Sequence, residues 1–149
     1  CCTGTGPMRP AWIRRSPSRG YHCSEALFIA VSEILLGELD PFVYKMLTGF
    51  AGGVGCSHTE LCGAISGAVL AIGARYGRTE VEVDDARCQA LVAQFREQFE
   101  TRFGATQCAA LQRLGYGANG TTPCRVLVGQ ATNLLLELLA AEEPARSDD

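Results

Sequence analysis

Charge is scarce in this sequence, and so are the motifs that mark several large classes of protein. Only 19% of the 149 residues are charged, and the net charge of −3 argues against a general nucleic-acid binder. The longest charge-free apolar run, from Leu61 to Ala74, is too short to span a bilayer, so we expect no membrane span. The glycine-rich segment has no Gly-Lys-Ser/Thr after it and no strand before it, which excludes a P-loop and a dinucleotide fingerprint.

Closely spaced cysteine pairs are absent as well. No Cys-x-x-Cys occurs, which argues against a thioredoxin-type dithiol and a zinc ribbon, and no Cys-x-x-Cys-His occurs, which excludes covalent haem. The chain nevertheless contains eight cysteines. Secreted disulfide scaffolds are usually shorter and poorer in core residues, whereas 47% of this chain is hydrophobic. We therefore expect a cytoplasmic protein whose cysteines serve metal, cluster or redox chemistry.

Composition divides the chain into one domain and two tails. Residues 1–20 contain four arginines, three prolines and no apolar signal-peptide segment, and we expect them to form a flexible basic tail that includes Cys1 and Cys2. Residues 143–149 form a polar tail. Residues 21–142 are expected to fold as a single domain.

Apolar residues recur at helical spacing along this domain, between glycine, proline and capping residues. The pattern predicts helices over residues 23–37, 41–48, 59–76, 84–103, 106–114 and 122–141. Apolar and polar residues nowhere alternate over a sustained stretch, so we predict no strand. We expect an all-α fold, a compact single-domain bundle of about four long and two short helices. Gly63, Gly67 and Ala71 are four residues apart, so their helix should let another backbone approach closely.

Four cysteines fall in the first turn of four of these helices. The predicted N-caps are Thr59, Thr106 and Thr122, and the cysteines are Cys23, Cys62, Cys108 and Cys124. Cys62 would take the third helical position, and Cys108 and Cys124 the second. Unpaired N–H groups and the helix dipole favour a thiolate there, the form that attacks disulfides and binds metal. Packing alone often buries a single cysteine, but four equivalent placements favour a functional cluster.

Other residues are less decisive. Cys88 lies on the apolar stripe of its helix and is interpreted as a core residue. Cys56 follows the glycine-rich loop and is either a resolving thiol, an additional metal ligand or a passive loop residue. His22 and His58 are either surface or capping residues or assistants of a neighbouring thiol.

Glycines surround the predicted start of the third helix. The loop over residues 49–55 includes Gly53 and Gly55, and Gly63 follows Cys62 directly. Glycine lets a backbone approach a bound group closely. We therefore predict that these three glycines contribute to a cofactor-binding site beside Cys62.

The order of these features resembles a known family. The segment Cys62-Gly63-Ala64-Ile65-Ser66-Gly67 fits the pattern Cys-Gly-Ala-x-x-Gly, after a glycine-rich loop and a helix that opens with Cys23, and before Cys108 and Pro123-Cys124. Roughly residues 20–140 resemble the C_GCAxxG_C_C family of redox-active proteins. The resemblance implies a redox role for Cys23, Cys62, Cys108 and Cys124. The family is related to the non-haem part of split-Soret cytochromes, which implies that the fold can hold an iron centre. His22 stands where family members often have asparagine, and Cys56 and Cys88 are additional.

We therefore expect a small redox-active protein, an electron carrier or an oxidoreductase, that works with a redox protein partner. Its four cysteines are expected either to bind an iron–sulfur cluster, with Cys56 as a candidate fifth ligand, or to exchange thiol and disulfide, with Cys62 attacking. The alternative is a non-catalytic helical interaction module with structural cysteines, favoured by the apolar last helix. That helix also makes a homodimer a candidate assembly.

Overall fold

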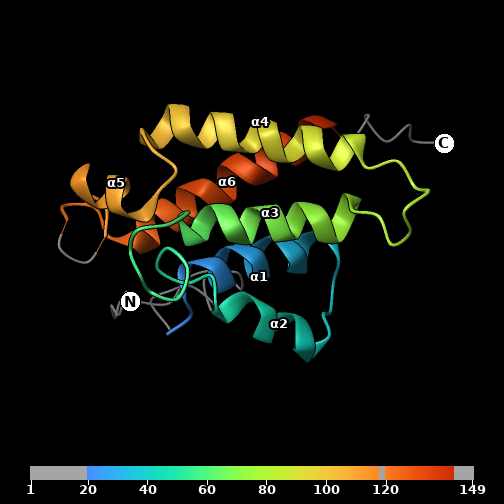
Figure 1. The fold of residues 1–149 in the computed structure, drawn as a ribbon, viewed down its shortest axis with the longest axis horizontal. Coiled ribbons are helices and arrows are strands. Elements are labelled where there is room, and N and C mark those ends of the chain that lie inside the picture. Colours follow the sequence, from blue (N-terminus) through green and yellow to red (C-terminus); the bar gives the residue numbers. More distant parts are fainter. Residues whose placement is uncertain (1–19, 118–119, 143–149) are drawn as a thin grey trace.

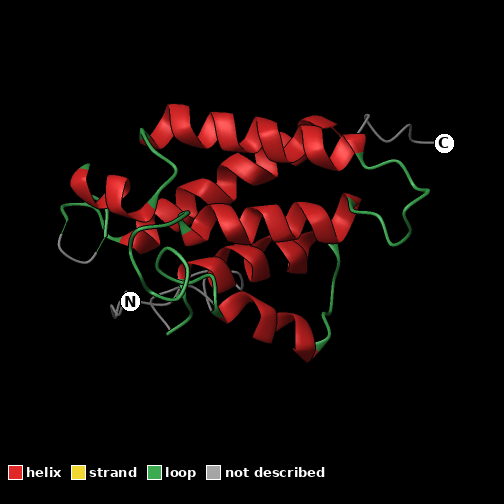
Figure 2. Ribbon diagram, in the orientation of Figure 1, coloured by secondary structure: helices red, strands yellow, loops and turns green. Residues whose placement is uncertain are grey.

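The structure, a computed structural model, describes residues 20–117 and 120–142. These residues form six helices: α1 (Cys23–Leu35), α2 (Pro41–Thr48), α3 (Gly63–Tyr76), α4 (Ala86–Phe103), α5 (Cys108–Arg113) and α6 (Cys124–Glu142). Loops join the helices (Figure 2), and the described residues form two isolated β-bridges but no strand. The all-α prediction is confirmed. Both predicted tails, with Cys1 and Cys2, lie outside the described residues apart from Gly20.

The helix α3 is the centre of the bundle. It packs against α1, α4 and α6, and Figure 1 shows it between α1 and α4, with α2 on the far side of α1. Phe28, Ile72, Phe95, Phe99 and Leu135 are among the fully buried side chains. Burial of this many large apolar groups is the main source of stability for the bundle.

Small residues allow α1 and α3 to touch through their backbones. A Cβ atom added at Gly67 would lie 2.5 Å from the backbone oxygen of Ser24 in α1. Real Cβ atoms do not approach an oxygen so closely, so only glycine fits this position. The predicted close approach at this face of α3 is confirmed.

Three predicted helix starts are corrected. The helix α3 begins at Gly63, so Cys62 is its N-cap residue, and α5 and α6 begin at Cys108 and Cys124 themselves. The residues before α3 and α5 form an antiparallel bridge between Leu61 and Gln107. This bridge holds the backbone extended where threonine caps had been expected to start the helices earlier.

Two further helix ends differ by two residues. The helix α1 ends at Leu35, two residues short of the prediction, and its Ile34 is exposed. The helix α4 begins at Ala86, two residues late. The carboxylate of Asp84 accepts a hydrogen bond from the Ala86 N–H (3.0 Å), which caps α4 from outside.

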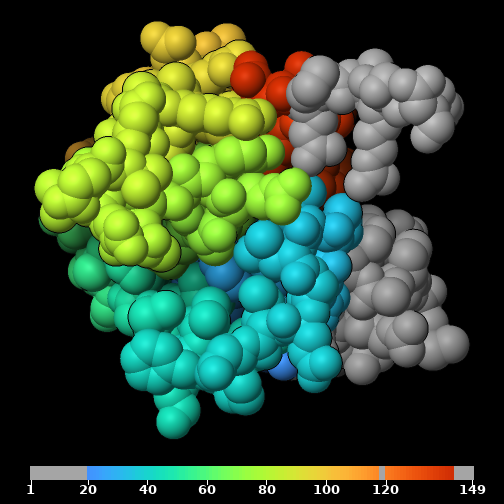
Figure 3. Space-filling view, turned by 90° about the vertical axis from the view of Figure 1, so that its right-hand side faces the viewer, coloured from blue at the N-terminus to red at the C-terminus, as the bar shows by residue number. Residues whose placement is uncertain are grey.

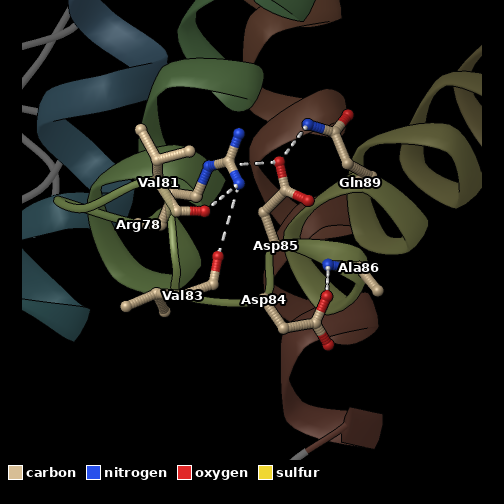
Figure 4. A network of polar contacts seen from close by, with 7 residues as sticks. All are labelled: Arg78, Val81, Val83, Asp84, Asp85, Ala86 and Gln89. Atoms are coloured by element: carbon tan, nitrogen blue, oxygen red, sulfur yellow. Dashed lines mark hydrogen bonds and ion pairs between the residues drawn. The ribbon is translucent and has the colours of Figure 1, made fainter.

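The loop between α3 and α4 closes the end of the bundle opposite the cysteines. The Arg78 guanidinium donates to two carbonyl oxygens of this loop and lies 3.7 Å from the Asp85 carboxylate (Figure 4). Figure 3 views the molecule from this end, where the same loop and the connection between α1 and α2 form much of the visible surface. Side chains and caps therefore fix this loop without any part in the cysteine site.

By length and composition, α6 is the one helix of the described residues that is apolar enough to cross a membrane. The expectation of no membrane span rests on the run from Leu61 to Ala74 and does not take α6 into account. Leu127, Ala131 and Leu135 of α6 are buried, and α6 packs on α1, α3 and α4. A core helix of a globular bundle has the same properties, so this feature is weak evidence for a membrane span.

Candidate functional site

The starts of α1, α3, α5 and α6 meet at one end of the bundle, on the left in Figure 1. A cavity of about 310 Å³ lies there, and its wall includes Cys23, Cys62, Cys108 and Cys124. The wall also includes Tyr21, His22, Gly52, His58, Gly63, Leu111, Gln112, Tyr116, Gly117, Gly120, Leu127 and Val128. Four cysteines that are distant in the sequence thus line one space.

The antiparallel bridge brings Cys62 and Cys108 to this cavity. The N–H of Cys62 donates to the oxygen of Thr106 (2.9 Å), and the N–H of Cys108 donates to the oxygen of Glu60 (2.8 Å). A Cβ at Gly53 would lie 2.8 Å from the Cβ of Cys108, so glycine is needed where the loop passes. Two backbone hydrogen bonds therefore align the starts of α3 and α5.

Glycine also makes room for Cys23. A Cβ at Gly63 would lie 2.2 Å from the sulfur of Cys23. The residue after Cys62 must therefore be glycine if the thiol of α1 is to reach the cavity in this arrangement. This explains the Cys-Gly step of the sequence motif in steric terms.

A buried carboxylate anchors the start of α1. Glu25 accepts hydrogen bonds from the N–H of His22 (2.9 Å) and from the hydroxyl of Thr48 at the end of α2 (2.6 Å). His22 is the N-cap residue of α1. Glu25 therefore fixes the backbone immediately before Cys23.

Cys124 follows a second isolated bridge. Thr122 donates to the oxygen of Gly115 and accepts from the N–H of Gly117, both at 2.9 Å. A Cβ at Gly117 would lie 3.9 Å from the sulfur of Cys124, an ordinary contact. The bridge holds the loop against the first turn of α6.

Burial dominates the electrostatics of Cys62. Its side chain is 7% exposed, and desolvation raises the pKa of its thiol to about 12. The nearby thiols of Cys23 and Cys108 act in the same direction, while the N–H groups of Ala64 and Ile65 oppose it. The expectation that a helix start lowers the pKa of this thiol is wrong, because desolvation outweighs the helix dipole. Its burial also speaks against Cys62 as the attacking thiol.

The loop before α3 has an unusual backbone. Its residues from Gly52 to Cys56 all have positive φ, including Val54 at 63° and Cys56 at 54°, and His58 has φ of 60°. Residues other than glycine rarely adopt this left-handed backbone region, so the loop is strained at Val54, Cys56 and His58. Strain of this kind clusters at functional sites, and here it precedes Cys62.

The remaining predicted residues are placed as follows. Gly63 lies in the cavity wall, whereas Cys56, Gly53 and Gly55 are not among the wall residues. Gly53 instead packs on Cys108, and Gly52, which the sequence analysis did not single out, takes the wall position. Cys88 is 8% exposed within the hydrophobic core, which confirms its interpretation as a core residue.

Sequence reasoning also missed Gln112. Its Nε2 lies 3.7 Å from the sulfur of Cys108 and 3.1 Å from Nδ1 of His58, and that Nδ1 is 3.7 Å from the same sulfur. The signal was available, because Gln112 follows Cys108 by four residues on one helix face. The sequence could not indicate that His58 would join this pair.

Comparison with known families supports the same grouping. Residues 21–138 match the family described as "Putative redox-active protein (C_GCAxxG_C_C)". No curated protein and no solved structure gives a significant match to the chain. The matched residues cover most of the chain and include all four cysteines of the cavity wall. The chain therefore belongs to the C_GCAxxG_C_C family of redox-active proteins.

Proposed function

We propose that this protein is an electron carrier whose four cavity cysteines bind an iron–sulfur cluster. The observation that carries the proposal is that thiols from four separate helix starts line one cavity. Membership of a redox-active family supports the general role. The choice of an iron–sulfur cluster over a single metal ion rests on the spacing of the thiols and the volume of the cavity between them.

The cavity suits a group with several metal atoms better than a single ion. In residues 20–117 and 120–142, no three His, Cys, Asp or Glu side chains are grouped closely enough to hold one ion. A single zinc ion needs its sulfur ligands at about 2.3 Å. In a cluster each thiolate ligates one of several iron atoms, so the sulfurs need not meet at one point. A cavity of about 310 Å³ between the thiols leaves room for such a group.

The proposed ligands are Cys23, Cys62, Cys108 and Cys124. When bound, the cluster would supply one-electron transfer. The chain itself contributes N–H groups at the helix starts, which favour negative charge on the sulfurs. The burial of Cys62 excludes water from one side of the site. A redox protein would be the partner that exchanges the electron.

Thiol–disulfide exchange is the second candidate. It is favoured by the 3.7 Å contact between the sulfur of Cys108 and Nδ1 of His58, since a histidine beside a thiol is a common means of activation. In this mechanism Cys108, which is less buried than Cys62, would be the attacking thiol.

Purification without air followed by iron, sulfide and thiol analysis separates these functions. We expect stoichiometric iron and sulfide with broad visible absorption. Cys62→Ser should lose both, whereas Cys88→Ser, which alters an equally buried cysteine outside the cavity wall, should keep both. A colourless protein whose thiols titrate reversibly would instead support exchange. Absence of both properties, with unreactive thiols, would overturn both proposals and leave the helical interaction module.

A further inference from the structure

Two side chains that are absent from the family's cysteine pattern contact Cys108. Nε2 of Gln112 is 3.7 Å from the Cys108 sulfur and 3.1 Å from Nδ1 of His58. The sulfur and Nδ1 are 3.7 Å apart. The three side chains thus form a closed triangle, and all three residues belong to the cavity wall.

We infer that Gln112 is a positioning residue for the redox centre, whose carboxamide donates one N–H to the sulfur of Cys108 and the other to Nδ1 of His58. This inference rests on the proposed function. A carboxamide has two N–H donors on one nitrogen, which matches the two contacts of Nε2. If the amide were turned over, its oxygen Oε1 would face the thiolate of Cys108. Both groups are hydrogen-bond acceptors, so this contact would be repulsive. In this arrangement Nδ1 of His58 accepts from the amide, which assigns the ring hydrogen to Nε2.

The strained loop holds His58 in place for this contact. The N–H of His58 donates to the oxygen of Gly52 (2.8 Å), although φ of His58 is 60°. A Cβ at Gly52 would lie 3.3 Å from Cε1 of the His58 ring, so glycine lets the ring lie against the loop. The loop thus fixes the imidazole, and the imidazole fixes the orientation of the Gln112 amide.

A hydrogen bond to a ligating sulfur changes the redox balance of the centre. The reduced state has one more negative charge than the oxidised state, and a donor at the sulfur stabilises that charge. Gln112 should therefore raise the reduction potential. A residue that only filled space at this position would leave the potential unchanged.

The test compares Gln112→Met with Gln94→Met. Methionine is similar to glutamine in shape and helix propensity but has no N–H donor. Gln94 is an exposed residue of α4 and serves as the matched control. In the iron-loaded protein we expect a more negative midpoint potential for Gln112→Met and an unchanged one for Gln94→Met. An unchanged potential in Gln112→Met with iron retained would overturn the inference.

His58→Asn is the second variant, because asparagine tolerates positive φ and should preserve the loop. We expect a shift in the same direction as in Gln112→Met but smaller, since the donor remains and only its orientation is lost. A shift of opposite sign would contradict the arrangement of donors given above.

Metal-free protein provides a readout that does not depend on a cluster. We expect iodoacetamide to label Cys108 several-fold more slowly in Gln112→Met than in Gln94→Met, because the thiolate has lost a donor. Slower labelling in a protein that never takes up iron would support the donor role while the proposed function fails. Equal labelling rates would overturn the donor role in either case.

Discussion

At the scale of single residues, the buried thiol of Cys62 makes stability depend on pH. Its pKa is raised from 9.0 to about 12 in the fold, so the unfolded chain loses this proton at lower pH than the folded chain does. Above pH 9.0 the folded protein binds more protons, and its free energy of unfolding must fall as pH rises through this window. Below pH 9.0 the stability that depends on the protonated Cys62 thiol is fully present.

We therefore predict that reduced, metal-free protein is progressively destabilised between pH 9.0 and about 12. Denaturant unfolding at several pH values measures this. Cys62→Ala should show a shallower dependence on pH, while Cys88→Ala provides the control for loss of a buried sulfur. Identical slopes in Cys62→Ala and the parent protein would contradict the assignment.

The glycine after Cys62 gives a second prediction at this scale. Gly63→Ala would place a Cβ atom 2.2 Å from the sulfur of Cys23, so α1 and α3 must separate or the thiol must turn away. We expect a loss of about 1–3 kcal/mol in the free energy of unfolding, as for overpacked cores, together with loss of bound iron.

Gly73→Ala is the matched control in the same helix. A Cβ at Gly73 would have no neighbour within 4 Å, and alanine is the better helix former by about 1 kcal/mol. We expect equal or greater stability and unchanged iron content. Thermal unfolding of both variants with iron analysis checks the pair, and similar losses in both would show that Gly63 has no special steric role.

Sequence reasoning was strongest for individual cysteines. Helix-start placement singled out the four that line the cavity, and an apolar stripe separated Cys88 from them. It failed for the pKa of Cys62, because the depth of burial depends on how segments distant in the sequence pack around this thiol. It also overlooked Gln112, whose role depends on a histidine from a distant loop.

At the scale of elements, the order and number of helices followed from apolar spacing, but their first residues did not. The starts of α3 and α5 depend on the bridge between Leu61 and Gln107. Threonine is a good N-cap in isolation, and nothing local to Thr59 or Thr106 indicates that these two segments will pair with each other. The bridge between Leu61 and Gln107 therefore determines where the two helices begin, in place of the local capping preference of threonine.

The start of α4 provides a prediction for a whole element. Asp84→Ala removes the carboxylate that caps this helix and should cost about 1 kcal/mol in the free energy of unfolding. Because the cap lies at the end of the bundle opposite the cysteines, iron content and potential should not change. Thermal unfolding and visible absorption measure the two effects. A loss of iron in this variant would mean that the two ends are coupled.

At the scale of the whole molecule, a bound group should hold together four helix starts that otherwise meet around a cavity of about 310 Å³. A ligand that binds only the folded state raises stability in proportion to the logarithm of its concentration over its dissociation constant. We predict that removing iron with a chelator lowers the melting temperature. In Cys62→Ser the chelator should have no effect, and an equal decrease there would point to iron bound elsewhere.

The backbone contact between Gly67 and Ser24 has one last consequence for the molecule. Main-chain atoms cannot change rotamer. The direct backbone contact therefore fixes the distance between α1, which carries Cys23, and α3, which follows Cys62. Side chains elsewhere in the interior can be exchanged, provided that their volume is preserved, without altering that gap. Most substitutions elsewhere in the core of the bundle should therefore leave the relative positions of the Cys23 and Cys62 sulfurs unchanged.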